Sequence, residues 1–169
     1  MSRRENQRQL LIIAAIVGVG FLLSRKAVAA PAPGAPATLP YDWRSAVEDA
    51  FVQAEQKYGI PPGVLKSMAG VESGFREDVV FCRTTGGAGE QGIMQITPRW
   101  HPTANACNPT AAIDYAASYL RKLYNRFGNW RMAVVAYNWG PTNLANKGYE
   151  QMPQVTWNYI NRVARETGI

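Results

Sequence analysis

Apolar residues recur at three- and four-residue steps through much of the chain. This spacing predicts a first helix from Asp42 to Tyr58, with Gly59 in the position of a helix cap. A second helix is expected to begin at Pro61-Pro62, because proline fits the first turn of a helix, and to reach Glu72. The front half of the globular part is therefore predicted to be helical.

Three more helices are predicted further along, each opened by an N-capping asparagine or by a proline. They start at Asn108-Pro109, at Asn129 and near Pro153, and the first of them ends at Gly128. Residues 73–96 contain five glycines and few periodic apolar positions, which indicates a loop with at most a short extended piece. The predicted fold class is all-α.

One apolar segment, 10–23, stands apart because it has no charge and is flanked by basic residues. At ~1.5 Å per residue it reaches about 21 Å, which is short for a ~30 Å hydrocarbon core and typical of a secretory signal. However, Arg25-Lys26 separate it from the small residues Ala27-Val28-Ala29 that would form a cleavage site. We therefore favour an uncleaved single-pass membrane helix over a cleaved signal. Both place the rest of the chain outside the cytoplasm, in the periplasm or another extracytoplasmic space.

Composition divides the chain into three parts. Residues 1–26 form the basic N-terminus and anchor, 27–40 a Pro/Ala-rich tether, and 41–169 one globular domain. The net charge of +6 would suggest nucleic acid or anionic lipid as a partner, but five of the basic residues lie in 1–40 and a net +2 remains for 41–169. Nucleic-acid binding is therefore not predicted.

Glu72 breaks the apolar pattern of its helix. Leu65, Met68 and Ala69 precede it by seven, four and three residues, so the carboxylate shares their apolar face. Burial there would raise the pKa of Glu72 and make it a general acid near neutral pH. The alternative is that Glu72 turns to solvent or pairs with Lys66 or Arg76.

Three strings of residues follow one another in order along the chain: Val71-Glu72-Ser73-Gly74-Phe75, Gly92-Ile93-Met94-Gln95-Ile96 and Ala136-Tyr137-Asn138-Trp139-Gly140. They resemble the motifs of the soluble lytic transglycosylase family, which shares a lysozyme-like helical fold with goose-type lysozyme. Residues Pro153, Thr156 and Tyr159 resemble its C-terminal motif, and the likeness covers roughly 45–165.

The resemblance implies a reaction and a set of roles. Glu72 would be the single catalytic acid/base, cleaving the β-1,4 bond between N-acetylmuramic acid and N-acetylglucosamine in peptidoglycan with formation of a 1,6-anhydro ring. Such a reaction needs no second carboxylate and no cofactor, and Glu77, Asp78 and Glu90 are expected to be solvent-facing loop residues. The residues with implied substrate-binding or orienting roles are Ser73, Met94, Gln95, Tyr137, Asn138, Trp139 and Tyr159.

For some of these residues, plainer interpretations stay open. Tyr137 and Tyr159 could be core residues with a satisfied hydroxyl, and Trp139 could be a wedge between helices instead of a sugar platform. The chain also departs from the family at Val155, where a glutamate is common, and at 81–87, which replaces a serine-proline pair. The first departure concerns the residue that would support Tyr159. The second concerns one wall of the substrate-binding cleft that the resemblance implies.

Two alternative functions use the same domain. A goose-type lysozyme activity would employ Glu72 with water as nucleophile and release a reducing end, and a non-catalytic peptidoglycan-binding component would not need the acid. The setting could be cell-wall turnover, a secretion or conjugation apparatus, or a virion that opens the wall during entry. The partner expected in each case is the glycan strand.

The two cysteines, Cys82 and Cys107, enclose a loop that carries Gln95. Outside the cytoplasm an even pair is expected to form a disulfide, worth ~3 kcal/mol in the chain-entropy picture. The alternative, a metal site formed with His101, matches no usual zinc spacing, so no metal is predicted.

Overall fold

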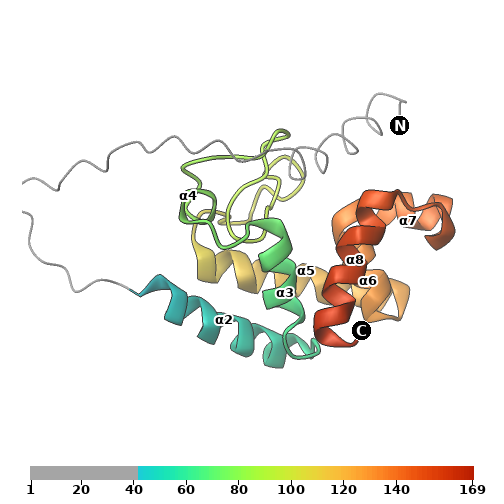
Figure 1. Cartoon of the computed structure of the whole chain (residues 1–169), viewed down its shortest axis with the longest axis horizontal. Coiled ribbons are helices and arrows are strands. Elements are labelled where there is room, and N and C mark those ends of the chain that lie inside the picture. Colours follow the sequence, from blue (N-terminus) through green and yellow to red (C-terminus); the bar gives the residue numbers. More distant parts are fainter. Residues whose placement is uncertain (1–41) are drawn as a thin grey trace, which may run out of the picture.

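The computed structural model describes residues 42–169, and this part of the chain is helical apart from loops and one β-bridge (Figure 1). The all-α prediction is confirmed there. The predicted membrane segment, 10–23, and the tether, 27–40, lie outside the described residues, and none of the helices within 42–169 has the length and apolar character needed to span a bilayer. The helices are α2 (Trp43–Tyr58), α3 (Val64–Glu72), α4 (Glu77–Val80), α5 (Pro109–Phe127), α6 (Trp130–Trp139), α7 (Pro141–Lys147), η1 (Tyr149–Gln151, a 3-10 helix) and α8 (Gln154–Thr167).

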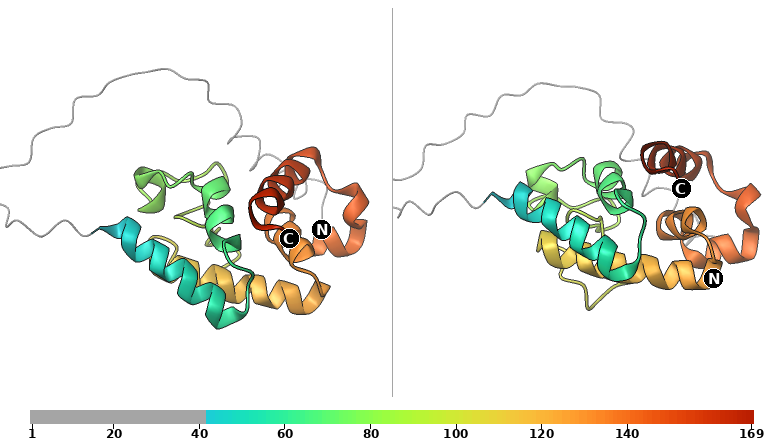
Figure 2. Two further views of the ribbon diagram at one scale, coloured as in Figure 1. Left: turned by 60° about the horizontal axis from the view of Figure 1, so that its bottom comes forward. Right: turned by 90° about the horizontal axis from the view of Figure 1, so that it is seen from below.

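The long helix α5 links two groups of helices. Helix α2 packs along α5, while α6 contacts α5 at its other end and is followed by α7 and α8 (Figure 2). Helix α3 stands between the groups, because it contacts α2 on one side and α8 on the other. The C-terminal end of α3 is therefore held between the two groups of helices, next to the long loop that joins α4 to α5.

The predicted caps explain several of the helix ends. Asn108 and Asn129 accept hydrogen bonds from the backbone amides of Ala111 and Met132, both at 3.1 Å, and so open α5 and α6. Gly59 takes the left-handed conformation that ends α2, at φ +62°. The two short helices α7 and η1 and the one-turn α4 were not predicted, because elements this short have little periodicity to detect.

Helix α3 begins later than predicted. Pro61-Pro62 precede the helix, and the first helical residue is Val64. Its free amides are capped by a residue from another helix, because Glu55 of α2 accepts hydrogen bonds from Gly63 N at 2.9 Å and from Leu65 N at 2.8 Å. Glu55 is itself buried, at 6% exposure. A tertiary contact thus fixes the start of the helix that carries Glu72.

The loop between α4 and α5 is tied down at three points. Gln91 and Ile96 form an antiparallel bridge with two backbone hydrogen bonds of 2.9 Å, which is the short extended piece that the sequence allowed. Gly92 lies between them at φ +71°, where any Cβ would overlap the carbonyl oxygen of Ala106. The predicted disulfide between Cys82 and Cys107 is present, with a Cα–Cα distance of 5.4 Å.

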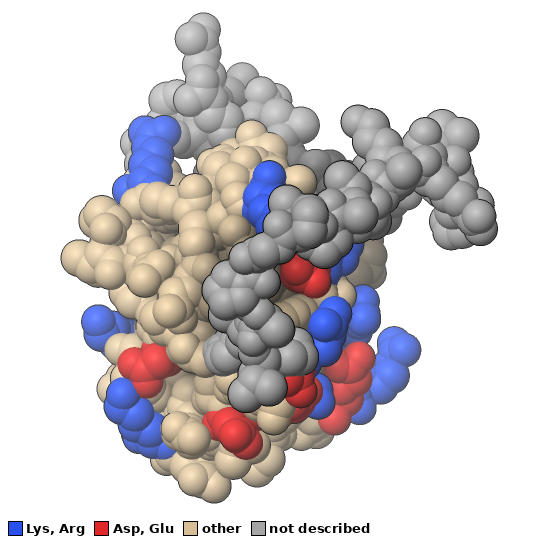
Figure 3. Space-filling model, turned by 90° about the vertical axis from the view of Figure 1, so that its left-hand side faces the viewer, with Lys and Arg blue, Asp and Glu red and all other residues tan. Residues whose placement is uncertain are grey.

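Basic and acidic side chains are interspersed on the face of the molecule shown in Figure 3. The described residues also form exposed ion pairs, such as Lys57–Asp114 at 2.7 Å and Lys66–Glu48 at 2.8 Å. Exposed pairs of this kind add little to stability. The packing of apolar helix faces therefore provides most of the stabilisation of the described domain.

Candidate active site

Glu72 is the last residue of α3, and the apolar surroundings predicted for it are present. Leu65, Met68 and Ala69 are fully buried, while Glu72 is half-buried and lines a cleft. Neither alternative partner reaches it, because Lys66 pairs with Glu48 and Arg76 with Asp78. The carboxyl group thus lies where an apolar helix face meets an open cleft.

The chain turns away sharply after Glu72. Gly74 and Phe75 both have positive φ, +59° and +55°, which ends the helix and leaves the carboxyl group at the cleft. Ser73 supports this turn, because its hydroxyl donates to Ala69 O at 3.0 Å and accepts from Phe75 N at 3.2 Å. Its hydroxyl is thus engaged with the backbone, and the implied substrate-binding role of Ser73 stays a prediction.

The surroundings of Glu72 favour its protonated form. Burial raises the pKa of Glu72 from 4.5 to about 8, the nearby Tyr159 hydroxyl opposes the rise, and the charge of Glu90 adds to it. At neutral pH the side chain therefore carries a proton. A carboxylic acid that faces a cleft in this state is equipped to donate that proton to a bound ligand.

Two tyrosines from the C-terminal group of helices face this carboxyl. Tyr159 of α8 is buried at 5% exposure, and its hydroxyl lies beside Glu72 without forming a hydrogen bond of full geometry to any described residue. Tyr137 of α6 donates to Met94 O at 3.0 Å. Burial and the charge of Glu72 hold the pKa of both phenols well above the ordinary value, so both remain donors. Tyr159 is thus free to orient Glu72, and Tyr137 connects α6 to the glycine-containing loop.

The cleft has a volume of about 1250 Å³, above the ~300–1,000 Å³ of small-ligand sites. It brings together six of the eight predicted catalytic and binding residues. A cleft of this size suits an extended ligand. The predicted residues that line it are Glu72, Ser73, Gln95, Tyr137, Asn138 and Tyr159, whereas Met94 and Trp139 do not line it.

The amides in the cleft differ in how they are held. Gln95 has a positive φ of +47°, and its Nε2 donates to Gly92 O at 2.9 Å, so the side chain is folded back onto its own turn. Asn138 Oδ1 is buried and has no hydrogen-bond partner within 42–169. A polar atom left in this state at a cleft is available to a ligand.

Met94 and Trp139 are buried core residues and do not line the cleft. Met94 is fully buried, and its contribution at the cleft is the carbonyl oxygen that binds Tyr137. Trp139 is 6% exposed at the end of α6, and the Lys147 ammonium lies 5.6 Å from its ring centroid. This placement agrees with the wedge interpretation of Trp139 more closely than with a sugar platform.

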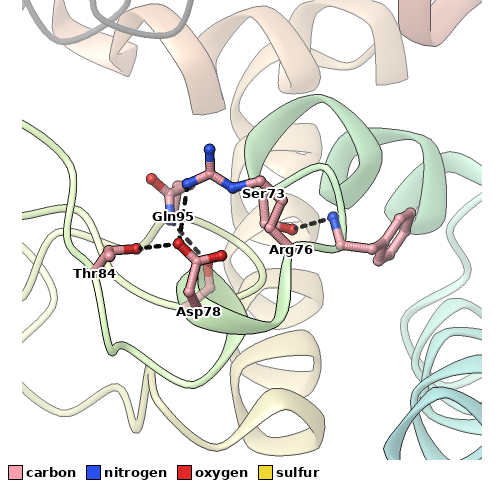
Figure 4. A network of polar contacts seen from close by, with 7 residues as sticks. Ser73, Arg76, Asp78, Thr84 and Gln95 are labelled. Atoms are coloured by element: carbon pink, nitrogen blue, oxygen red, sulfur yellow. Dashed lines mark hydrogen bonds and ion pairs between the residues drawn. The ribbon is translucent and has the colours of Figure 1, made fainter. Parts of the chain in front are cut away.

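The segment that replaces the family's serine-proline pair forms one wall of the cleft. Thr84 through Gly87 line it, and Asp78 of α4 holds this wall by accepting from Thr84 at 3.0 Å and pairing with Arg76 at 3.5 Å (Figure 4). Val155, the other departure, also lines the cleft near Tyr159. The departures therefore fall on the cleft itself.

The expectation that Glu90 faces solvent is wrong. Glu90 is only 6% exposed and lines the same cleft as Glu72, whereas Glu77 lies exposed in the first turn of α4. The residues around Glu90 are polar and glycine-rich, so no periodicity marks it as buried. Glu90 is buried because the loop folds back on itself next to the Gln91–Ile96 bridge. The sequence pattern does not show this fold of the loop.

A group of aromatic residues that lines the cleft, formed by His101, Tyr115 and Tyr119, was also missed. His101 contacts Tyr115 through a 3.0 Å hydrogen bond, and its ring packs on Tyr119 with centroids 4.7 Å apart. His101 is thus engaged with tyrosines.

The alternative of a metal site formed by Cys82, Cys107 and His101 is wrong, because both cysteines are in the disulfide. Residues 42–169 contain no cluster of three or more His, Cys, Asp or Glu side chains suited to a metal.

Comparison with known proteins identifies the family. The family model described as "Transglycosylase SLT domain" matches residues 49–160. A protein named transglycosylase from Enterobacteria phage PRD1 is 34% identical over 98 residues, which make up 56% of this chain and 35% of the phage protein. The protein IpgF of Shigella flexneri is 27% identical over 128 residues, 70% of this chain and 84% of IpgF, and IpgF of Shigella sonnei is 28% identical over 138 residues, 76% and 88%.

The chain spans about a third of the length of the phage relative, and no solved structure matches it. The family match begins within α2 and ends within α8, and it includes every predicted residue that lines the cleft. Since that match extends over more than half of the chain, this protein belongs to the transglycosylase SLT domain family.

Proposed function

We propose that this protein is a peptidoglycan lytic transglycosylase that cleaves the β-1,4 bond between N-acetylmuramic acid and N-acetylglucosamine. The observation that carries the proposal is a protonated carboxylic acid, Glu72, exposed to a cleft that is large enough for a glycan strand. Membership of the family supports the same substrate class.

The proposed reaction uses one acid/base in two steps. Glu72 donates its proton to the glycosidic oxygen, the bond from that oxygen to the anomeric carbon breaks, and the substrate's acetamido group supports the positive charge that develops. Glu72, now a carboxylate, removes the proton from the muramyl 6-hydroxyl, whose oxygen bonds to the anomeric carbon. The products are a 1,6-anhydro end and a free 4-hydroxyl, no water is consumed, and Glu72 regains its proton.

The raised pKa suits both steps. At pH 7 an acid with a pKa of about 8 is mostly protonated, so it can donate in the first step. After donation, the same buried surroundings make the carboxylate a stronger base than an exposed glutamate. Tyr159 is proposed to orient the carboxyl group, and Gln95, Tyr137 and Asn138 to bind the sugar amides and hydroxyls.

The test is mass spectrometry of the fragments released from purified peptidoglycan sacculi. We expect fragments with anhydro ends from the wild-type protein and near-complete loss of release with Glu72→Gln, which keeps shape but cannot donate the acid proton. Glu77→Gln is the matched control, because it removes an exposed carboxylate that pairs with Arg83 at 3.3 Å. Residual release above about a tenth of wild type in Glu72→Gln would assign the acid to another residue.

Hydrolysis is the second candidate, and the burial of Glu90 in the same cleft is the observation that favours it. A second carboxylate could activate water for attack at the anomeric carbon, as in two-carboxylate glycosidases. The products of hydrolysis carry a reducing end and exceed the anhydro products by the mass of one water. The same mass spectra therefore distinguish the two reactions.

We also propose that the catalytic domain works outside the cytoplasm, held to the membrane through 10–23 and reaching nearby glycan over the tether 27–40. The disulfide between Cys82 and Cys107 supports this location, because disulfides persist in oxidising compartments. The intact mass of the isolated protein tests this proposal. A retained anchor gives the mass of the full chain, whereas a cleaved signal gives a shorter chain that lacks 10–23.

A further inference from the structure

A second carboxylate, Glu90, shares the cleft with Glu72 although the proposed reaction needs only one. Glu90 is 94% buried, its Oε2 accepts from Ala88 N at 3.0 Å, and its Oε1 is buried with no hydrogen-bond partner within 42–169. Burial of a carboxylate oxygen without a partner costs free energy. Such a feature in a cleft calls for a functional explanation.

The position of Glu90 is fixed by its own loop. Its carbonyl oxygen accepts from Gly86 N at 2.9 Å, and a Cβ at Gly86 would overlap Oε2, so the two residues are in close contact. On its other side, Gln91 enters the bridge to Ile96, and the disulfide closes the loop around both. The carboxylate is therefore held in place next to the cleft.

We propose that Glu90 is a positioning residue of the active site, whose fixed negative charge keeps Glu72 in the proton-donating form. It acts through Glu72, which lines the same cleft. The proposal rests on the proposed function, in which Glu72 is the acid/base. In the second step the same charge makes the Glu72 carboxylate a stronger base for the muramyl 6-hydroxyl.

Other ionisable groups also line the cleft around Glu72, and they act differently. Arg76 pairs with Asp78, and Arg162 of α8 pairs with Glu166 at 3.6 Å. Glu90 is the carboxylate whose charge raises the pKa of Glu72, in addition to burial, while Tyr159 lowers it. Within 42–169, the ionisable residues that line the cleft with Glu72 are Tyr137 from α6, Tyr159 and Arg162 from α8, Tyr115, Tyr119 and Lys122 from α5, and Arg76, Glu90 and His101 from the loops.

The test is the pH dependence of sacculus cleavage by the full chain with Glu90→Gln. The cleavage rate should fall at high pH as Glu72 loses its proton, and this fall is the alkaline limb of the pH–rate profile. Removing the charge of Glu90 should move the alkaline limb to lower pH by at least about 0.3 unit, which corresponds to a twofold change in the protonated fraction of Glu72. Glu90→Asp keeps the charge and should restore most of the wild-type limb. Glu77→Gln is the control from the same region and should leave the limb in place, because this side chain is exposed.

Two outcomes would overturn the proposal. One is a Glu90→Gln limb within 0.3 unit of wild type, and the other is loss of cleavage at every pH by folded Glu90→Gln, which would assign Glu90 a direct role on the substrate. A second measurement needs no activity: carbon-13 NMR titration of the Glu72 carboxyl should show a lower pKa in Glu90→Gln. If the Glu72→Gln protein still cleaves sacculi, the proposed function fails. If Glu72→Gln is inactive and the alkaline limb of Glu90→Gln is unmoved, only the role of Glu90 fails.

Discussion

The raised pKa of Glu72 should reduce the stability of the fold as the pH increases. The pKa is about 8 in the folded protein against an ordinary value of 4.5, so the unfolded chain releases a proton that the folded protein retains between those pH values. A group of this kind contributes stability that is fully present below its unfolded pKa and is lost as pH rises through the folded pKa. Replacing Glu72 by glutamine removes this titration and leaves the shape of the side chain.

The expected magnitude follows from the size of the shift. Relative to Glu72→Gln, the free energy of unfolding of the wild type should fall by about 1.4 kcal/mol per pH unit across the window between the two pKa values. At pH 7 the accumulated loss is of order 3 kcal/mol, which is a large share of the ~5–15 kcal/mol that stabilises a typical domain. The variant should therefore be inactive and more stable near neutral pH, as expected where a functional group is kept in unfavourable surroundings.

The assay is urea unfolding of both proteins, followed by far-ultraviolet circular dichroism, at several pH values from below the ordinary pKa of Glu72 to above its folded pKa. The difference between the proteins isolates Glu72, because the other titrating groups are common to both. A difference that stays constant with pH, within ~0.5 kcal/mol, would refute the conclusion that burial shifts the protonation of Glu72. Glu77→Gln, which changes an exposed carboxylate, should show little pH-dependent difference.

Two further predictions concern the neighbours of Glu72. Tyr159→Phe should lower kcat about tenfold through looser orientation of the carboxyl, and should move the alkaline limb to higher pH, because the hydroxyl lowers the pKa of Glu72; an unchanged profile would contradict the role of Tyr159. Replacing Cys82 and Cys107 together by alanine should lower the free energy of unfolding by ~3 kcal/mol in denaturant titrations, and thiol labelling of the native protein should find neither cysteine free, whereas a fully labelled pair would contradict both the bridge and the extracytoplasmic location.

The elements that the sequence predicted correctly are those whose causes are local. The long helix α5 has its N-cap, its first-turn proline and its terminal glycine within its own sequence, and all three act as expected. The start of α3 was missed because its cap, Glu55, comes from the preceding helix and becomes a cap only when α2 and α3 pack together. The periodicity of apolar residues predicts which face of a helix is buried, but it does not predict a hydrogen bond between two helices.

The same distinction separates the parts of the candidate site. Glu72 was found because a carboxylate on an apolar helix face is visible in the spacing of the sequence. Trp139 could not be placed from spacing, since a tryptophan at a helix end fits a core or a cleft equally well, and its burial results from tertiary packing. Glu90 was assigned to solvent because polar neighbours and glycines normally indicate an exposed loop.

The glycines around Glu90 allow close packing within the loop that the sequence predicted. Gly92 allows the bridge to lie against Ala106, and Gly86 leaves room for the Glu90 carboxylate, so both permit close approach within a loop that the disulfide holds closed. Helix α3 supplies the acid, but this loop supplies a charge that helps to set its protonation. A change in the loop should therefore alter the working pH of the enzyme without touching Glu72, and a loop of different sequence on the same helices would give an acid of different strength.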